Sequence, residues 1–294
     1  MTKTLLKYAM CALVAALAAC ETWGVSVAPV NPAFLRWQKE RKNKKVSPQA
    51  TNVQSRVMSL SVSGTEELEE NPDFGLIPEP FDSSYLANLN TGLDCGIQDA
   101  LPSKYDLRTC GCLTPVKNQN PYGTCWAYAT LGSVEMGINH EEGIEYDFSE
   151  NNMANLHGWD WGFNDGGNAT ISSAYLLRWS GPVLESIDPY PNPGGSVENE
   201  PARHVQRVRW VPGRTYYLDL DGIKKALMEC GALHVSYYHA NKGGSSPALS
   251  YYNYSTSSYY KYDGAGNRRT NHAVVLVGWD DDYPKGNFKK QPPG

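Results

Sequence analysis

One cysteine of this 294-residue chain lies in a setting that suits a nucleophilic thiol. Cys125 follows the turn-forming residues 118–124 and opens a segment in which apolar side chains, such as Leu131 and Val134, recur at helical spacing. Thr124 is a suitable N-cap, so Cys125 is predicted in the first helical turn. Unsatisfied N–H groups and the helix dipole favour a negative charge there, and hence the thiolate over the thiol.

A thiolate at a helix start needs a cation as well, because the dipole alone contributes only about 0.3 to 1 kcal/mol. His272 is the best candidate, since it opens the apolar run 273–279, which is typical of a buried strand that would fix the ring. His234 is the rival, but the alternation over residues 233–238 predicts a half-buried strand with this histidine on its wetter face. The other histidines lie in polar or turn-like segments: His140, His157, His204 and His239.

The elements that must position these residues follow from the same periodicities. A helix is predicted after Cys125, with Gly137 and Gly143 as stop signals. Strands are predicted over residues 205–210, 232–238 and 272–280, and the tyrosine-rich residues 251–262 predict a surface hairpin.

The motif Gly123-Thr124-Cys125-Trp126, with a histidine 272 − 125 = 147 residues downstream, resembles the papain and cathepsin group of cysteine peptidases. That group carries C-G-[SA]-C-[WY], with its histidine roughly 130 to 150 residues further on. The similarity spans about residues 101–283. It includes the helix start 148–152, the glycine loop 165–168 and a helix leading into a strand over 223–238.

The resemblance implies a two-lobed α+β fold, in which a helical lobe carries Cys125, a β-rich lobe carries His272, and the cleft lies between them. Cys125 would attack the scissile carbonyl, and His272 would hold the thiolate and protonate the leaving amine. Gln119 would donate its side-chain amide to the oxyanion.

Substrate-binding positions are implied in the same way. Gly167 would hydrogen-bond an extended substrate backbone, Gly166 would keep that wall low, and Ala273 would border the pocket for the side chain two residues before the cut. Without the motif, the two glycines would read equally well as a tight turn. Tyr122 stands where the family usually has a second cysteine, and Asn271 replaces the aspartate often found before the histidine.

The family orients its histidine with an asparagine in a motif like N-S-W-G, and no such motif lies between His272 and Gly294. Asn287 is the asparagine that remains, but its polar, turn-forming neighbours do not predict an orienting strand. The sequence thus predicts a domain that lacks its final strands.

The first twenty residues are typical of a secretory signal, with Lys3 and Lys7 before the apolar residues 8–17. This run is too short to span a bilayer. The ending Leu-Ala-Ala-Cys20 resembles a bacterial lipobox, which implies lipidation of Cys20; cleavage after Ala18 or Ala19 is the alternative. We therefore expect an exported protein, either lipid-anchored in the cell envelope or secreted.

Three parts follow: a signal peptide over residues 1–20, a propeptide-like lead-in over 21–100, and the peptidase domain over 101–294. The lead-in is polar apart from an apolar island at 74–81, which is expected to dock on the neighbouring domain. A net charge of −5 gives no electrostatic footprint for nucleic acid, and the basic cluster 39–45 reads as a solvated segment.

Export permits disulfides. Cys95, Cys110, Cys112 and Cys230 allow three pairings, among which the sequence does not choose. Zinc is the rival use of these cysteines, but Cys110-Gly111-Cys112 lacks both the usual C-x2-C spacing and a matching second half. The sequence therefore predicts no metal and no cofactor.

The leading functional hypothesis is an exported bacterial cysteine endopeptidase that acts on polypeptides and touches a membrane only through a lipid anchor. One alternative is a weakly active or inactive surface lipoprotein that serves as a binding or adhesion module. The other is a Cys-His amidase that acts on cell-wall peptides. The sequence specifies no oligomeric state.

Overall fold

The computed structural model describes residues 29–44, 75–82, 100–211, 219–240, 250–262 and 270–293. The signal region with Cys20, most of the lead-in, and Cys95 lie outside the described residues. Within the described residues, no helix is long and apolar enough to cross a membrane.

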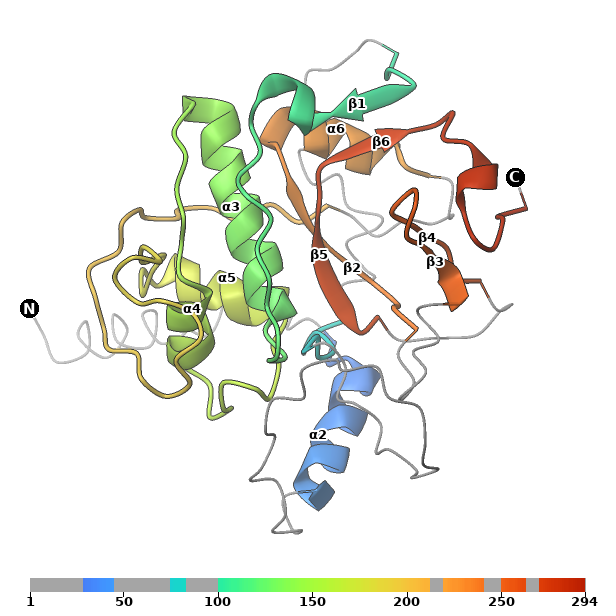
Figure 1. The fold of residues 1–294 in the computed structure, drawn as a ribbon. Helices are drawn as coiled ribbons and strands as arrows, with labels where there is room; N and C mark the ends of the chain where they lie inside the picture. Colours follow the sequence, from blue (N-terminus) through green and yellow to red (C-terminus); the bar gives the residue numbers. More distant parts are fainter. Residues whose placement is uncertain are drawn as a thin grey trace, which may run out of the picture.

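Helices and short antiparallel strands make up the described chain (Figure 1). The helices are α2 (Pro32–Lys44), α3 (Cys125–Glu142), α4 (Glu150–Leu156), α5 (Ala169–Leu177) and α6 (Asp221–Cys230), with 3-10 turns η2 (Leu107–Cys110) and η3 (Lys285–Asn287). The strands are β1 (Lys104–Asp106), β2 (Leu233–Tyr237), β3 (Tyr252–Asn253), β4 (Ser258–Tyr259), β5 (His272–Leu276) and β6 (Gly278–Asp280).

The helical lobe is built on α3, which packs against α4 and α5. Trp126, Leu131, Phe148 and Tyr175 are almost fully buried in its core. The shorter helices begin at caps that the sequence supplies. Ser149 accepts a hydrogen bond from the Asn152 N–H at the start of α4, and Asn168 accepts one from the Ile171 N–H at the start of α5.

The β-rich lobe holds two antiparallel pairs, β2 with β5 and β1 with β6. In the first pair Tyr237 lies opposite His272, and Leu233 lies opposite Leu276. A second core of Leu107, Leu227 and Ala232 lies beneath these strands and α6. The tyrosine-rich segment forms the hairpin β3–β4, as predicted.

The two lobes meet where α3 crosses β5 (Figure 1). Gly132 allows this close approach, because a Cβ at that position would lie 3.0 Å from Cγ2 of Val275. The predicted two-lobed α+β fold is therefore confirmed, with Cys125 on the helical lobe and His272 on the β-rich lobe.

Three local predictions were wrong. Residues 205–210 form no strand, although they alternate. Gly137 lies inside α3, which continues to Gly143, where a left-handed backbone (φ 68°) ends the helix. His234 does not face water, because its Nδ1 lies 2.9 Å from Oγ1 of Thr130 on α3. For His234, the neighbouring helix α3 overrides the local pattern.

Two segments of the lead-in dock on the domain. The docking of the apolar island was predicted, whereas that of α2 was not, and Arg41 of α2 belongs to the basic cluster that was expected to be solvated. In α2, Phe34 stacks on Trp37, whose ring meets Trp161 of the helical lobe edge-on at 5.1 Å. Arg41 adds an ion pair with Asp165. In the second docked segment, residues 75–82, Leu76 and Ile77 are buried.

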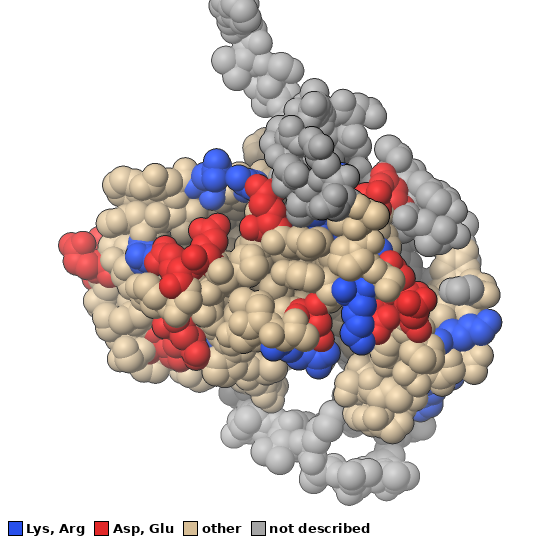
Figure 2. Space-filling view, turned by 90° about the horizontal axis from the view of Figure 1, so that it is seen from above, with Lys and Arg blue, Asp and Glu red and all other residues tan. Residues whose placement is uncertain are grey.

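Charged side chains of both signs are interspersed on the molecular face shown in Figure 2. On that face the described residues form no continuous basic stripe of the kind that a nucleic-acid backbone would need.

Candidate active site

Cys125 is the first residue of α3 and is fully buried. Thr124 occupies the N-cap position, as predicted, but its hydroxyl bonds to the Tyr190 hydroxyl at 2.9 Å instead of capping the helix. Cys125 therefore lies where the N–H groups of an 18-residue helix point, which favours its thiolate.

The backbone N–H of Ala273 donates to Sγ of Cys125 at 3.4 Å. Ala273 directly follows His272 in β5, so this bond joins the two lobes at the residue beside the predicted catalytic histidine. The structure thus brings Cys125 and the start of β5 together across 148 positions of sequence.

His272 lies in an aromatic environment that the sequence did not predict. Its ring centroid lies 5.6 Å from that of Tyr237 and 6.1 Å from that of His239. The Tyr237 hydroxyl is 3.0 Å from Nδ1 of His239, which in turn stacks on Tyr259 at 4.8 Å. β-Pairing and the β3–β4 hairpin assemble these rings, so no local motif could have revealed them.

Asn271 holds this cluster in place. Its side-chain oxygen accepts from the His239 N–H at 2.7 Å, and its Nδ2 donates to the His239 carbonyl at 2.9 Å. Asn271 therefore holds the segment that follows β2 through both backbone groups of His239.

Burial shapes the electrostatics of the site. Burial, together with the smaller effect of the nearby charge of His239, lowers the pKa of His272 to about 4. Burial also raises the pKa of Tyr237 to about 12, with the negative charges of Tyr259 and Cys125 adding to this effect. A buried His272 is thus neutral at pH 7 in this state of the chain.

Gln119 lies in the turn that leads into α3. The side-chain Nε2 of Gln119 donates to the backbone carbonyl of Tyr122 at 2.8 Å. The backbone carbonyl of Gln119 accepts from the Tyr190 hydroxyl at 2.5 Å. The first bond uses one of the two N–H groups of the amide. These two bonds therefore hold both the side chain and the backbone of Gln119 in the loop that precedes Cys125.

Gly166 and Gly167 form a wall against which the lead-in lies. The Gly167 N–H donates to the Gly75 carbonyl at 2.7 Å, and the Gly167 carbonyl accepts from the Ile77 N–H at 2.9 Å. Gly166 has φ 91°, and a Cβ there would lie 2.5 Å from the Gly75 carbonyl oxygen. Side chains on this wall would exclude the extended segment.

Leu76 completes the contact, because it forms one buried cluster with Cys125, Ala129 and Ala273. Gly75 lies so close to the loop before Cys125 that a Cβ would be 1.8 Å from the Gly123 carbonyl oxygen. The chain's own segment therefore covers the predicted nucleophile.

Glu79 secures the same segment at the N-terminus of α5. Its carboxylate accepts from the Ala169 N–H at 3.0 Å and from the Thr170 N–H at 3.2 Å. These bonds satisfy helix donors that would otherwise lack partners. Burial raises the pKa of Glu79, although both bonds lower it.

A network of ion pairs centred on Lys117 lies on the helical lobe, away from Cys125. Lys117 contacts Glu135 at 2.7 Å, Glu150 at 3.0 Å and Asp147 at 2.7 Å, beside a hollow of about 290 Å³. Burial raises the pKa of Glu150 to about 8, whereas the charge of Lys117 lowers it. The network ties the loop before Cys125 to α3 and α4.

Asn287 lies in η3, and its carbonyl accepts hydrogen bonds from the side chains of Asn253, Thr256 and Ser258. Its backbone thus anchors the β3–β4 hairpin. Among the described cysteines, Cys110 bonds to Cys112 and Cys230 keeps its thiol, which matches none of the three pairings in full; Cys95 lies outside the described residues.

Comparison with known proteins agrees with this geometry. The profile of the papain family cysteine proteases matches residues 101–289, which is more than half of the chain. Mouse procathepsin L is 29% identical over 192 residues, covering 65% of this chain and 54% of the relative. Bovine cathepsin S is 27% identical and covers 61% and 52%. The chain spans about half the length of these curated relatives.

Solved structures show the same fold. The cysteine protease and lectin-like domains of Cwp84, a surface layer associated protein of Clostridium difficile, superpose with a TM-score of 0.57 at 22% identity, covering 91% of this chain and 51% of that one. Cwp84 after propeptide cleavage gives a TM-score of 0.51 at 26% identity, covering 66% and 48%. The chain therefore belongs to the papain family of cysteine proteases.

Proposed function

We propose that this protein is an exported cysteine endopeptidase that hydrolyses peptide bonds through Cys125 and His272. The observation that carries the proposal is the bond from the Ala273 N–H to Sγ of Cys125, at the N-terminus of an 18-residue helix. It places the thiol where a thiolate is favoured and next to the strand that begins with His272.

The reaction needs two steps. The Cys125 thiolate attacks the scissile carbonyl carbon, and the oxyanion accepts hydrogen bonds from the Gln119 amide and the Cys125 backbone N–H. His272 then gives its proton to the leaving amine as the C–N bond breaks. Water, deprotonated by His272, hydrolyses the thioester and regenerates the thiolate.

The substrate is an extended polypeptide. The two backbone bonds between Gly167 and residues 75–77 support this proposal, because they are bonds that any extended chain can make. In the same proposal, Gly166 keeps the wall low, and Ala273 borders the adjoining side-chain pocket.

Residues 75–82 act as a plug in the unprocessed chain. Leu76 lies against Cys125, and Glu79 is held by the N-terminus of α5. We accordingly assign residues 21–100 as a propeptide-like lead-in and residues 101–294 as the peptidase domain.

Labelling with a thiol-directed epoxide tests the nucleophile. The full chain is allowed to process, treated with the epoxide, mapped by mass spectrometry, and assayed on denatured casein. We expect modification at Cys125 together with loss of casein cleavage. Cys125→Ser should abolish both the epoxide labelling and the casein cleavage seen without the epoxide, and Cys230→Ser should retain both. Casein cleavage that survives Cys125→Ser would refute the proposal.

Export and anchoring rest on Lys3, Lys7 and the Leu-Ala-Ala-Cys20 ending. The similarity to a surface layer associated protein agrees with a place in the cell envelope. Metabolic labelling with a fatty-acid probe should mark the wild-type chain and fail to mark Cys20→Ser. Purified peptidoglycan, assayed beside casein, separates the peptidase from a cell-wall amidase.

A further inference from the structure

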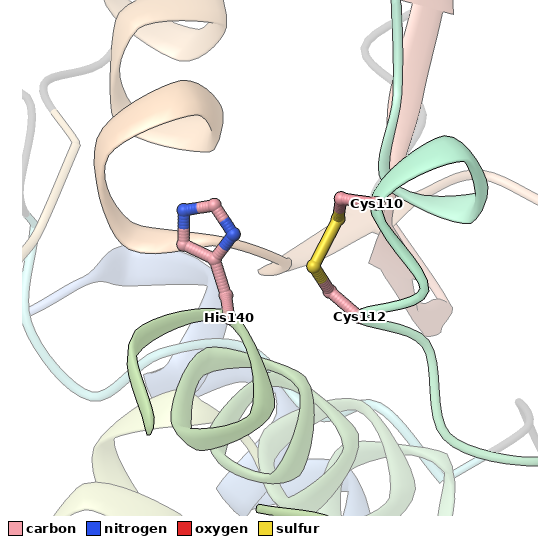
Figure 3. A group of neighbouring side chains, drawn as sticks. All are labelled: Cys110, Cys112 and His140. Carbon is pink, nitrogen blue, oxygen red and sulfur yellow. A yellow bond between two sulfur atoms is a disulfide. The ribbon is translucent and has the colours of Figure 1, made fainter. Parts of the chain in front are cut away.

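We propose that Cys110, Cys112 and His140 bind Zn²⁺ once the Cys110–Cys112 disulfide is reduced. The sulfur atoms and the nearest imidazole nitrogen lie within 4.8 Å of one another. Figure 3 shows the His140 ring, carried by α3, beside the two sulfurs at the end of η2. Thiolate sulfur and imidazole nitrogen are the ligands that Zn²⁺ prefers.

This cluster is separate from the peptidase site. His140 follows Cys125 by 140 − 125 = 15 residues along α3, which is about 22 Å at 1.5 Å per residue. The cluster lies at the opposite end of the helix, where the carbonyl groups carry partial negative charge and favour a bound cation.

The backbone holds the two cysteines together independently of the sulfur–sulfur bond. Gly111 has φ 70° and ends η2, its N–H pointing at the Arg108 carbonyl at 3.4 Å, while the Cys112 N–H donates to the Leu107 carbonyl at 3.4 Å. The disulfide joins residues only two positions apart. So short a closed loop removes little entropy from the unfolded chain, so the bond adds little as a staple.

A contact between the two elements holds the third ligand in place. Nδ2 of Asn139 donates to the Gly111 carbonyl at 3.5 Å, which ties the loop between the cysteines to the residue before His140. On the other side, a Cβ at Gly231 would lie 3.2 Å from Cβ of His140, so the chain after α6 packs closely on this histidine. The dithiol and imidazole are thus presented together after reduction.

The chemistry balances with a low-molecular-weight thiol as reductant. Two such thiols supply two electrons and two protons, which cleave the Cys110–Cys112 bond and leave one external disulfide. Zn²⁺ then displaces the two thiol protons, forms two Zn–S bonds and one Zn–N bond, and keeps water as its fourth ligand. Zn–S bonds of about 2.3 Å at a tetrahedral angle need sulfurs about 3.8 Å apart, which the opened turn must allow.

The test uses the full chain carrying Cys125→Ser, which removes the catalytic thiol as a competing ligand. The protein is reduced with a phosphine under argon, freed of the phosphine, and titrated with Co²⁺ as a spectroscopic probe, followed by competition with Zn²⁺. We expect a thiolate-to-cobalt charge-transfer band that saturates at one equivalent and that Zn²⁺ removes. The oxidised chain should show no such band, and this comparison needs no substitution at the site.

Variants assign the ligands. Cys110→Ser and Cys112→Ser should each abolish the band, and His140→Gln should weaken Co²⁺ binding by about tenfold or more, since even the outer partners of metal ligands are worth that much. Cys230→Ser is the matched thiol control, because its sulfur faces Arg209 at 3.4 Å, and His204→Gln is the matched histidine control. Both should bind Co²⁺ as the parent does.

The proposal is overturned if the reduced chain gives no band. It is equally overturned if the band persists in Cys110→Ser or Cys112→Ser, because other cysteines would then bind the metal. A band that His140→Gln leaves unchanged would exclude His140 as a ligand. None of these readings depends on peptidase activity.

Discussion

At the proposed catalytic residues Cys125 and His272, solvation decides the protonation state of the histidine. Burial lowers the pKa of His272 to about 4, so the imidazolium that should stabilise the Cys125 thiolate is disfavoured while the cleft is covered. The residue types thus indicate a thiolate–imidazolium pair, whereas the burial of His272 decides whether the imidazolium can form.

Gln119 provides the sharpest test at the scale of one residue. We expect Gln119→Ala in the processed enzyme to lower kcat by about a hundredfold to a thousandfold, because one oxyanion donor is lost, with a much smaller change in KM. Steady-state kinetics on a peptide substrate measures this.

The control for Gln119→Ala is Asn118→Ala, one position earlier, whose side chain accepts from the Asn120 N–H. It should keep kcat. If Gln119→Ala changes only KM, the amide binds substrate without stabilising the oxyanion.

Among the elements, the plug makes the most specific contact. Gly75 has φ 104°, and a Cβ there would overlap the Gly123 carbonyl. We expect Gly75→Ala to displace residues 75–82 and to speed alkylation of Cys125 by iodoacetamide in the unprocessed chain, which mass spectrometry can follow. Gly194→Ala is matched in backbone conformation, with φ 73° and no atom within 4 Å, and should leave the rate unchanged. Equal rates in the two variants would contradict the plug.

Lys117 links three elements through buried carboxylates. We expect Lys117→Met to lower the free energy of unfolding by about 3 to 5 kcal/mol, because it removes the cation that the buried Glu135 and Glu150 side chains contact and leaves these polar groups without that partner. Urea unfolding at pH 7 measures this.

Lys104→Met removes a solvent-exposed ion pair with Asp280 and should leave the free energy of unfolding close to that of the parent chain. Similar losses in the two lysine variants would show that the Lys117 network is not effectively buried.

Across the whole molecule, the contact between the lobes should be sensitive to acid. His234 joins β2 to α3 through Thr130, and burial lowers its pKa to about 4 from an ordinary value of 6.5. As the pH falls below 6.5, His234 binds a proton in the unfolded chain but stays neutral in the folded chain. The free energy of unfolding therefore decreases. The loss approaches about 3 kcal/mol near pH 4.

His234→Gln should therefore flatten the decline in unfolding free energy between pH 6.5 and 4. Urea midpoints measured at several pH values check this, with the exposed His204→Gln as the control that leaves the decline unchanged. An identical decline in His234→Gln would contradict the assignment.

The sequence by itself determined the family, indicated Cys125 as the candidate nucleophile and predicted the helix that this residue opens. Those signals are local: a turn, an N-cap and helical spacing identify Cys125, and an apolar run identifies the strand of His272. The glycine loop and the helix start at Ser149 were equally readable, because capping and turn preferences act within a few residues. The helix α5 that begins after Asn168 was not predicted.

Only the tertiary structure decided what surrounds these residues. It turned His234 toward α3, placed Tyr237 and His239 beside His272, laid Leu76 on Cys125, and brought His140 to Cys110 and Cys112. These contacts join segments far apart in the chain. They depend on which faces pack together and on how far burial strips groups of water, and no short stretch of sequence encodes either.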